Sequence, residues 1–220
     1  VSELDDQIGR LIEALKARGE YDRTLIIVTS DHGEMLGDHW LLGKAGFFRE
    51  AFHVPLIVRD PLAATTRGGT LDAFTEHVDL VPTILERFGL EVPLQCDGRS
   101  LAPFLDGRPA LGWRAAAHYE HDFRDVETLT FETRLGLPSD RCQLAVHHGK
   151  RFVYVHFNGL RPLCFDLEAD PAQFTDIAGE PKRAPDVLEQ AQAMLTWRMD
   201  AAERRLTGCK LTRDGVIGRF

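Results

Sequence analysis

The chain has 220 residues, of which 34 are acidic and 26 basic, so its formal net charge is −8. This acidic balance argues against nucleic acid or an anionic membrane surface as the main partner. With 44% hydrophobic and 27% charged residues, the composition is ordinary for a globular protein, and no apolar run approaches the roughly 20 residues of a membrane-spanning helix. The four cysteines lack short paired spacings, which indicates neither a zinc ribbon nor a disulfide scaffold.

The first segment, residues 1–16, predicts an amphipathic helix. Its apolar side chains recur at helical spacing, and acidic residues lie near its start, where the helix dipole favours them. The apolar positions are Val1, Leu4, Ile8, Leu11, Ile12 and Leu15. Gly19 is typical of a helix end, and we expect a structural role for this helix.

Two short apolar runs, residues 25–28 and 54–58, have the composition of strands. Both are β-branched and unalternating, which suits strands buried on both faces of a parallel sheet. The first run leads to Asp31 and His32, and ligands in open α/β sheets bind beyond the carboxyl ends of the strands. A carboxylate beside an imidazole suits a divalent metal, and Gly33 would let the backbone turn sharply just past the pair. The tripeptide Asp31-His32-Gly33 alone could equally be a chance match or a helix N-cap.

The loop over residues 33–53 holds further polar candidates. Lys44 stands among glycines that make the loop compact, and a lysine beside a metal would suit an anion, although a lone lysine is more often a surface residue. His39 could contact metal or substrate, but we favour support of the loop. Glu34 is either a group that orients His32 or, slightly favoured, a solvated acid.

Residues 77–87 predict a second helix. Asp79 fits its cap and Pro82 its first turn, which gives Asp79 a structural rather than a catalytic role. A short amphipathic piece follows at residues 101–105 within a stretch rich in proline and glycine.

The segment over residues 118–123 is dense in metal-ligand types and alternates like a strand. The pair His118 and His121 is spaced for a helix rather than a strand, so a metal site of its own is a weak interpretation. Residues 141–146, 152–157 and 162–165 then predict an antiparallel meander, supported by Asn-Gly at the second turn.

The last periodic segment, residues 184–205, predicts a helix that packs on this meander. The tail from Gly208 to Phe220 shows no periodic signal.

Several of these segments together resemble the sulfatase branch of the alkaline phosphatase superfamily. Within it they most resemble phosphonate monoester hydrolases and related phosphodiesterases, with choline and aryl sulfatases next. The matching stretches are VSELDDQIGRLIEAL at residues 1–15, SDHGEMLGDHWLLGKAGFFREAFHVPLIVRDP at 30–61, HVDLVPTILERFGL at 77–90, DGRSLAPFLDG at 97–107, AAHYEHDFRD at 116–125 and FDLEADPAQFTDIA at 165–178. They cover most of the chain.

The resemblance implies roles for particular residues. Asp31 and His32 become ligands of one divalent metal (Mn, Zn or Ca), and Lys44 a contact to the substrate oxyanion. His118 and His121 are placed on the substrate side of the crevice.

The resemblance also implies a fold. It is α/β, part of an alkaline-phosphatase-like α/β sandwich followed by a small antiparallel sheet with a C-terminal helix. Residues 1–115 would be the C-terminal portion of the catalytic domain with half of the metal site, and residues 116–220 a small β subdomain.

The chain departs from the family pattern at the nucleophile. The family uses a Cys/Ser-x-Pro-x-Arg segment and an early Asp pair, and neither is present. Cys96 lies in CDGRS, which has no proline and an arginine at the wrong spacing. We therefore expect the chain to be a fragment that is inactive by itself.

The expected function of the full protein is hydrolysis of phosphonate monoesters or phosphodiesters, which are small anionic esters. A sulfatase is the first alternative, although Asn in place of His32 would be the commoner pattern in calcium-dependent sulfatases. The second alternative is a non-catalytic module that folds, packs or oligomerises, and a homo-oligomer is compatible with either reading.

Overall fold

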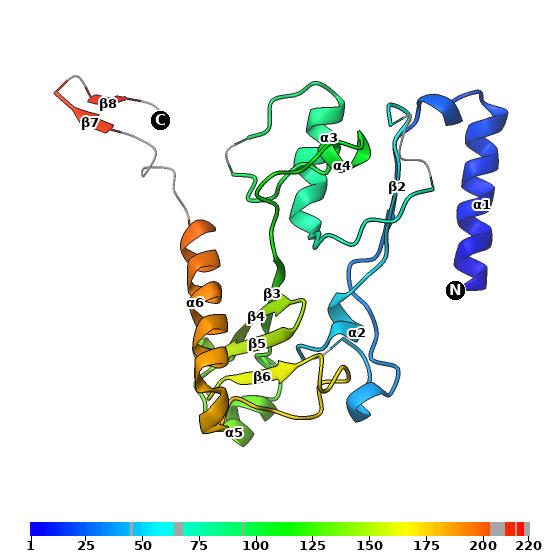
Figure 1. Ribbon diagram of the computed structural model, residues 1–220. Helices are drawn as coiled ribbons and strands as arrows, with labels where there is room; N and C mark the ends of the chain where they lie inside the picture. Colours follow the sequence, from blue (N-terminus) through cyan, green and yellow to red (C-terminus); the bar gives the residue numbers. More distant parts are fainter. Residues whose placement is uncertain (45, 64–67, 94, 203–209, 214, 218–220) are drawn as a thin grey trace.

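A computed structural model describes residues 1–44, 46–63, 68–93, 95–202, 210–213 and 215–217 (Figure 1). Its helices are α1 Ser2–Ala17, α2 Arg49–Phe52, α3 Leu80–Arg87, α4 Ala102–Leu105, α5 Thr130–Leu135 and α6 Ala184–Asp200. Its strands are β1 Ile26–Thr29, β2 Leu56–Arg59, β3 Ala116–Asp122, β4 Gln143–Gly149, β5 Phe152–Phe157, β6 Leu163–Asp166, β7 Lys210–Thr212 and β8 Gly215–Ile217. Single 3-10 turns lie at Tyr21–Arg23, Asp38–Trp40, His77–Asp79, Ser139–Arg141 and Pro181–Arg183.

The strands β1 and β2 pair with each other in antiparallel orientation, with Ile26 opposite Arg59 and Thr29 opposite Leu56. The parallel arrangement expected from the two apolar runs is therefore wrong for this pair. Burial on both faces is wrong too in the described structure, because Ile57 is 63% exposed. A β-branched run favours a strand without encoding the direction of its partner, and the connection is long enough for either direction.

The small sheet has the strand order β3-β4-β5-β6, and all of its pairs are antiparallel. The expected meander, the strand over residues 118–123 and the helix beyond them are thereby confirmed. The helix α6 ends at Asp200, short of the expected residue 205. The sequence analysis did not predict α2, α5 or the β7–β8 hairpin in the tail.

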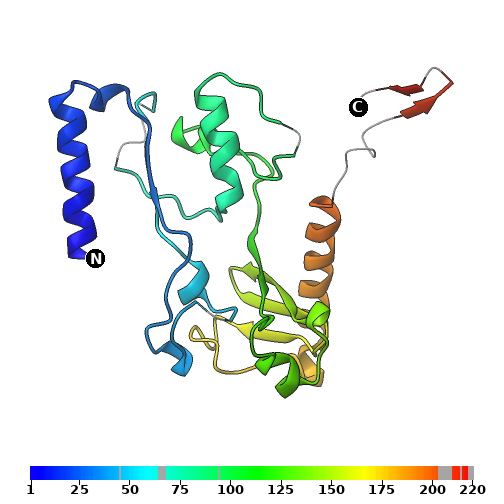
Figure 2. The same ribbon diagram turned by 180° about the vertical axis from the view of Figure 1, so that it is seen from behind.

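The sheet has a hydrophobic cluster on each face because its strands alternate. One cluster consists of Leu144, Val146, Val153, Val155 and Phe165, with Phe47 and Tyr119 among the residues packed against it. The other consists of Ala145, Tyr154, Cys164, Ile177 and Met194, and Trp197 of α6 packs against it. The sheet therefore lies between α6 and the segment that leads into α2, and both views of the ribbon show this arrangement (Figures 1 and 2).

The helix α1 confirms the first predicted element but buries none of its residues. Leu4 and Leu11, on the predicted apolar face, are 65% and 60% exposed. Figure 2 shows α1 beside the β1–β2 pair and away from the small sheet. None of the helices in the described residues combines the length and apolarity needed to cross a membrane.

The carboxylate of Asp79 joins three segments of the chain rather than serving only as a cap. Its side chain is fully buried and accepts backbone N–H groups from Glu76 and Arg99, each at 2.9 Å. It also forms a two-pronged ion pair with Arg114, whose Nη2 lies 2.7 Å from Oδ1. The expected structural role is confirmed, although the side chain makes no cap hydrogen bond to α3.

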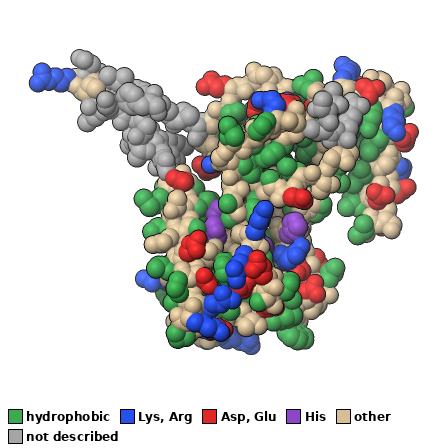
Figure 3. Space-filling view, in the orientation of Figure 1, with side chains coloured by type: hydrophobic (Ala, Val, Ile, Leu, Met, Phe, Trp, Pro, Cys, Tyr) green, Lys and Arg blue, Asp and Glu red, His purple; other side chains and the backbone are tan. Residues whose placement is uncertain are grey.

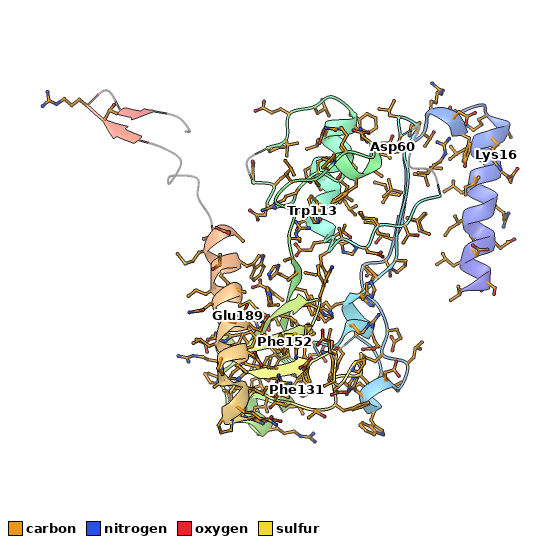
Figure 4. The ribbon with its side chains drawn as sticks, viewed as in Figure 1. Lys16, Asp60, Trp113, Phe131, Phe152 and Glu189 are labelled. Atoms are coloured by element: carbon orange, nitrogen blue, oxygen red, sulfur yellow. The ribbon has the colours of Figure 1, made fainter. Side chains whose placement is uncertain are left out.

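Specific contacts connect the stretch before β3 to the segment before α3 and to α4, and connect the end of β2 to α3. Trp113, labelled in Figure 4, donates its indole N–H to the carbonyl of Phe74 at 2.7 Å and meets the ring of Phe104 edge-on at 4.7 Å. Asp60, also labelled there, pairs with Arg87 of α3 at 2.6 Å. These contacts tie the end of β2, α3 and the approach to β3 into one unit.

Histidine and basic side chains gather on one face of the molecule, between the small sheet and the part of the chain around α3 (Figure 3).

Two histidines of β4 have lowered pKa values. Burial lowers the pKa of His147 to about 4, and the neighbouring His118 acts in the same direction. Burial also lowers the pKa of His148 to about 4, with the charges of Arg49 and His53 adding to the effect. Both imidazoles are therefore neutral in the folded protein near neutral pH.

These two histidines should make the protein less stable in mild acid. An unfolded histidine titrates near about 6.5, so between that pH and about 4 the unfolded state binds more protons. Stability should fall as the pH drops through this window and should lose no more to these groups below it. Urea unfolding of His148→Gln should show a shallower fall than the wild type, whereas the exposed His156→Gln should not. Equal slopes for wild type and His148→Gln would contradict this assignment.

Candidate active site

The candidate site is a pocket of about 280 Å³ where three elements meet. The loop after β1, the short helix α2 and the strand β3 each contribute to its wall. The lining residues are Asp31, His32, Lys44, Ala51, Phe52 and His121. The structure thus brings together four of the residues that the sequence singled out and adds an apolar pair from α2.

Asp31 and His32 present two electron-pair donors to the same point. The Nδ1 of His32 lies 2.8 Å from the carbonyl oxygen of Gly33, which can only accept, so Nδ1 carries a proton. In the neutral ring Nε2 then has a free lone pair, and it lies 3.5 Å from Oδ2 of Asp31. Two acceptors facing each other at this distance suit a cation between them, as metal-binding imidazoles and carboxylates do.

Gly33 fixes this pair against α2 by a close backbone contact. Its N–H donates to the carbonyl of Ala51 at 2.8 Å. A Cβ at this position would lie 1.9 Å from the carbonyl oxygen of Glu50, which no side chain could tolerate. Glycine is therefore required here for close approach, which is a different reason from the sharp turn expected from the sequence.

Lys44 brings positive charge to the pocket. Its charge is one of the influences that lower the pKa of Asp31, after the backbone N–H and the ring of His32. The exposed Glu34 holds the Lys44 loop closed, because its Oε1 accepts the N–H of Gly43 at 2.5 Å. Glu34 does not hydrogen-bond the His32 ring, so the orienting role considered for it is not seen; the ring is oriented by Gly33 instead.

His39 lies outside the pocket and supports the loop, as the favoured interpretation held. Its ring stacks on Phe48 with centroids 3.6 Å apart and an interplanar angle of 10°. It also contacts Phe174 from the segment after β6, at 4.9 Å. The alternative role in metal or substrate contact stays a prediction.

His118 also lies outside the pocket, on the opposite face of β3 from His121. Its ring stacks on Trp197 of α6 at 4.5 Å, and its Nε2 is 2.9 Å from Nδ1 of His147. Glu76 accepts its backbone N–H at 2.8 Å. Residues three apart on a strand point to opposite faces, so the strand pattern itself separates His118 from His121. The placement of His118 on the substrate side stays a prediction.

His121 reaches the pocket from the small sheet. Burial lowers the pKa of this imidazole, and the charge of Lys44 lowers it further, while Asp122 opposes both. Its ring meets that of Phe52 at 6.4 Å and 73°. The ring of Phe52 stacks on Tyr119 at 4.2 Å and also lines the pocket.

The metal donors in this chain form only part of a coordination shell. Across the described residues, no group of three or more His, Cys, Asp or Glu side chains is placed to hold an ion. Structural and catalytic metal sites use at least three protein ligands in most cases. Asp31 and His32 therefore fit a divalent metal in type and orientation, but the remaining ligands would have to come from elsewhere.

Comparison with known proteins finds relatives that match along the whole chain. The sulfatase family model matches residues 1–90. A multifunctional alkaline phosphatase superfamily protein of Trinickia caryophylli is 46% identical over 220 residues, which are 100% of this chain and 43% of that protein. An N-acetylglucosamine-6-O-sulfatase of Bacteroides thetaiotaomicron is 34% identical over 198 residues, covering 87% of this chain and 33% of that protein.

Solved structures agree with the sequence comparison. The phosphonate monoester hydrolase of Agrobacterium radiobacter matches all of this chain with a TM-score of 0.94 and 45% identity, over 44% of its own length. That of Silicibacter pomeroyi matches 99% of this chain with a TM-score of 0.91 and 38% identity, over 43% of its length. The chain thus spans less than half the length of these relatives. The expected alkaline-phosphatase-like fold class and the resemblance to the sulfatase branch of the alkaline phosphatase superfamily are confirmed, and the chain is similar over its whole length to part of the phosphonate monoester hydrolases.

Proposed function

We propose that the full protein containing this chain is a metal-dependent hydrolase of phosphonate monoesters or phosphodiesters. The observation that carries the proposal is the pocket in which the Asp31 carboxylate and the free Nε2 of His32 face each other at 3.5 Å beside Lys44. A metal held there would polarise the phosphoryl oxygens and lower the pKa of the nucleophile. This chain contributes no nucleophile segment, so it is inactive when it stands alone.

Lys44 would contact the oxygens of the transferring group. Lys44 lines the same pocket as Asp31 and His32, although the chain as a whole carries a net charge of −8. An anionic ester is therefore attracted by local positive charge rather than by the overall field. A donor aimed at an oxygen that gains charge in the transition state contributes about 10²–10³-fold to the rate.

Imidazole and carboxylate ligands bear on the choice of metal. Mn and Zn accept both nitrogen and oxygen donors, whereas Ca prefers an all-oxygen shell. His32 therefore favours Mn or Zn over Ca. This preference also favours the hydrolase of phosphorus esters over the calcium-dependent sulfatase.

A sulfatase remains the second candidate because the Bacteroides N-acetylglucosamine-6-O-sulfatase is 34% identical over 198 residues. The same pocket would serve a sulfate ester, since both substrates place a tetrahedral anionic group between metal and lysine. Identity is higher to the phosphonate monoester hydrolase of Agrobacterium radiobacter, at 45% over the whole chain. This difference supports the phosphorus ester.

The proposal is tested on the product of the complete reading frame that contains this chain. It would be assayed with an aryl phosphonate monoester, an aryl phosphodiester and an aryl sulfate, with Mn, Zn or Ca added. We expect the fastest turnover on the phosphonate monoester or the diester. Fastest turnover of the sulfate would establish the sulfatase instead, and a folded product that turns over none of the three would leave a non-catalytic module.

A further inference from the structure

The pocket has two chemically different sides. Asp31, His32 and Lys44 supply charge and metal-binding donors from one loop. The other side supplies a methyl group and two aromatic rings, from Ala51 and Phe52 of α2 and from His121 of β3. An anionic ester is likewise divided, with a charged group at one end and an organic group at the other.

The aromatic side is held in place by the small sheet. Phe52 stacks on Tyr119 with centroids 4.2 Å apart and an interplanar angle of 16°. The hydroxyl of Tyr119 donates to the carbonyl of Phe47 at 3.0 Å, which ties β3 to the segment before α2. His121 follows Tyr119 by two residues on the same face of β3, so the strand delivers both rings to the same side.

The imidazole of His121 is suited to an uncharged organic group. Burial and the nearby Lys44 keep it neutral, as its lowered pKa indicates. Within the described part of the chain its ring contact is the edge-on approach to Phe52 at 6.4 Å, which leaves the ring available to a ligand. Aromatic rings associate favourably at centroid distances of about 4.5–7 Å in edge-on or offset geometry.

The size of the pocket limits what can bind. Its volume of about 280 Å³ lies just below the usual range of roughly 300–1,000 Å³ for small-molecule sites. A single ring beside a tetrahedral anionic group suits this space better than a chain of sugars. The organic group would then lie against Phe52 and His121.

We propose that His121, together with Phe52, forms the binding surface for the organic group of the ester and selects aromatic over small alkyl groups. This inference rests on the proposed function for its reaction but adds a specificity-determining residue from the small C-terminal sheet. That sheet would then complete the substrate site as well as pack on α6.

The test compares a phenyl and a methyl ester of the same phosphonate, using the product of the complete reading frame. His121→Asn should lower kcat/KM for the phenyl ester by about 2- to 10-fold, the range that one aromatic contact supplies, mainly through KM, and should leave the methyl ester within about 2-fold. His121→Phe should keep the preference because it keeps a ring. The control His156→Asn, at an exposed position of β5, should leave kcat/KM unchanged for both esters.

Two outcomes would overturn the inference. One is an equal loss for both esters with His121→Asn, and the other is no loss for either. Circular dichroism of each variant identifies a folding failure, in which case His121→Phe alone decides, by keeping or losing the preference.

A wild type that hydrolyses neither ester would contradict the proposed function, and the inference would then need a separate test. The inference is then decided by binding of the same phenyl and methyl esters, which stay intact in that case, with nuclear magnetic resonance of the histidine imidazole signals as the measurement. Tighter binding of the phenyl ester that disappears in His121→Asn supports the inference. Binding that is equal for the two ligands, or unchanged in the variant, overturns it.

Discussion

Replacing Asp31 with Asn is expected to weaken binding of Mn²⁺ or Zn²⁺ by at least about 100-fold, more than is usual for groups that only support a metal ligand. The variant keeps the shape of the side chain but loses the negative charge that faces Nε2 of His32 at 3.5 Å. Any hydrolysis by the full protein should fall by about 10³-fold or more, because the metal supplies several kcal/mol of transition-state stabilisation. Titration calorimetry with the metal and steady-state kinetics are the measurements.

The matched control for this variant is Asp22→Asn. The Asp22 side chain is 94% exposed and pairs with Arg59, away from the pocket residues. The Asp31 side chain is itself 84% exposed, so neither variant should unfold the protein. If the metal affinity of Asp31→Asn stays within about 3-fold of the wild type, the change is smaller than the loss of a metal ligand produces. That result would contradict the assignment of Asp31 as a ligand.

Replacing Arg114 with Met is expected to lower the free energy of unfolding by about 3–5 kcal/mol. Asp79 is 0% exposed and Arg114 12% exposed in their side chains, so the variant would leave a buried carboxylate without its cation. Two backbone N–H groups, from Glu76 and Arg99, would remain on the carboxylate but cannot replace the charge. Urea unfolding measured near neutral pH gives the difference.

The exposed pair of Lys182 and Glu180 provides the control, with side chains 80% and 38% exposed. Lys182→Met should change stability by less than about 1 kcal/mol. If Arg114→Met costs no more than Lys182→Met, the buried pair does not organise the junction between α3 and β3.

Local patterns predicted the elements that their own residues determine. The spacing of Leu4, Ile8 and Leu11 was sufficient for α1, and the alternation over residues 118–123 for β3. The direction in which β1 pairs with β2 was missed because an apolar run does not specify its partner's direction. The helix α5 was missed because its six residues, Thr130–Leu135, are too few for a periodic signal.

The candidate site was predictable in part from resemblance and in part from geometry. Asp31, His32 and Lys44 come from one loop, so the family pattern in that loop placed them together. The separation of His118 from His121 was available in the sequence, since a strand sends residues three apart to opposite faces.

Other features join distant segments and leave no local signal. Phe52 meets Tyr119 from β3, and Asp79 meets Arg114 from beyond α4. The contact of Gly33 with the backbone of Glu50 is of the same kind. Such pairings follow from the fold, so they could be found only after it was known.

The central claim is that Asp31 and His32 hold the same divalent metal, and anomalous diffraction tests it most directly. Crystals of the product of the complete reading frame would be grown with Mn²⁺ or Zn²⁺ and measured at the absorption edge of the metal. The account predicts one strong peak at about 2.0–2.2 Å from both a carboxylate oxygen of Asp31 and Nε2 of His32. A fully loaded crystal whose peaks all lie away from these two side chains would contradict it.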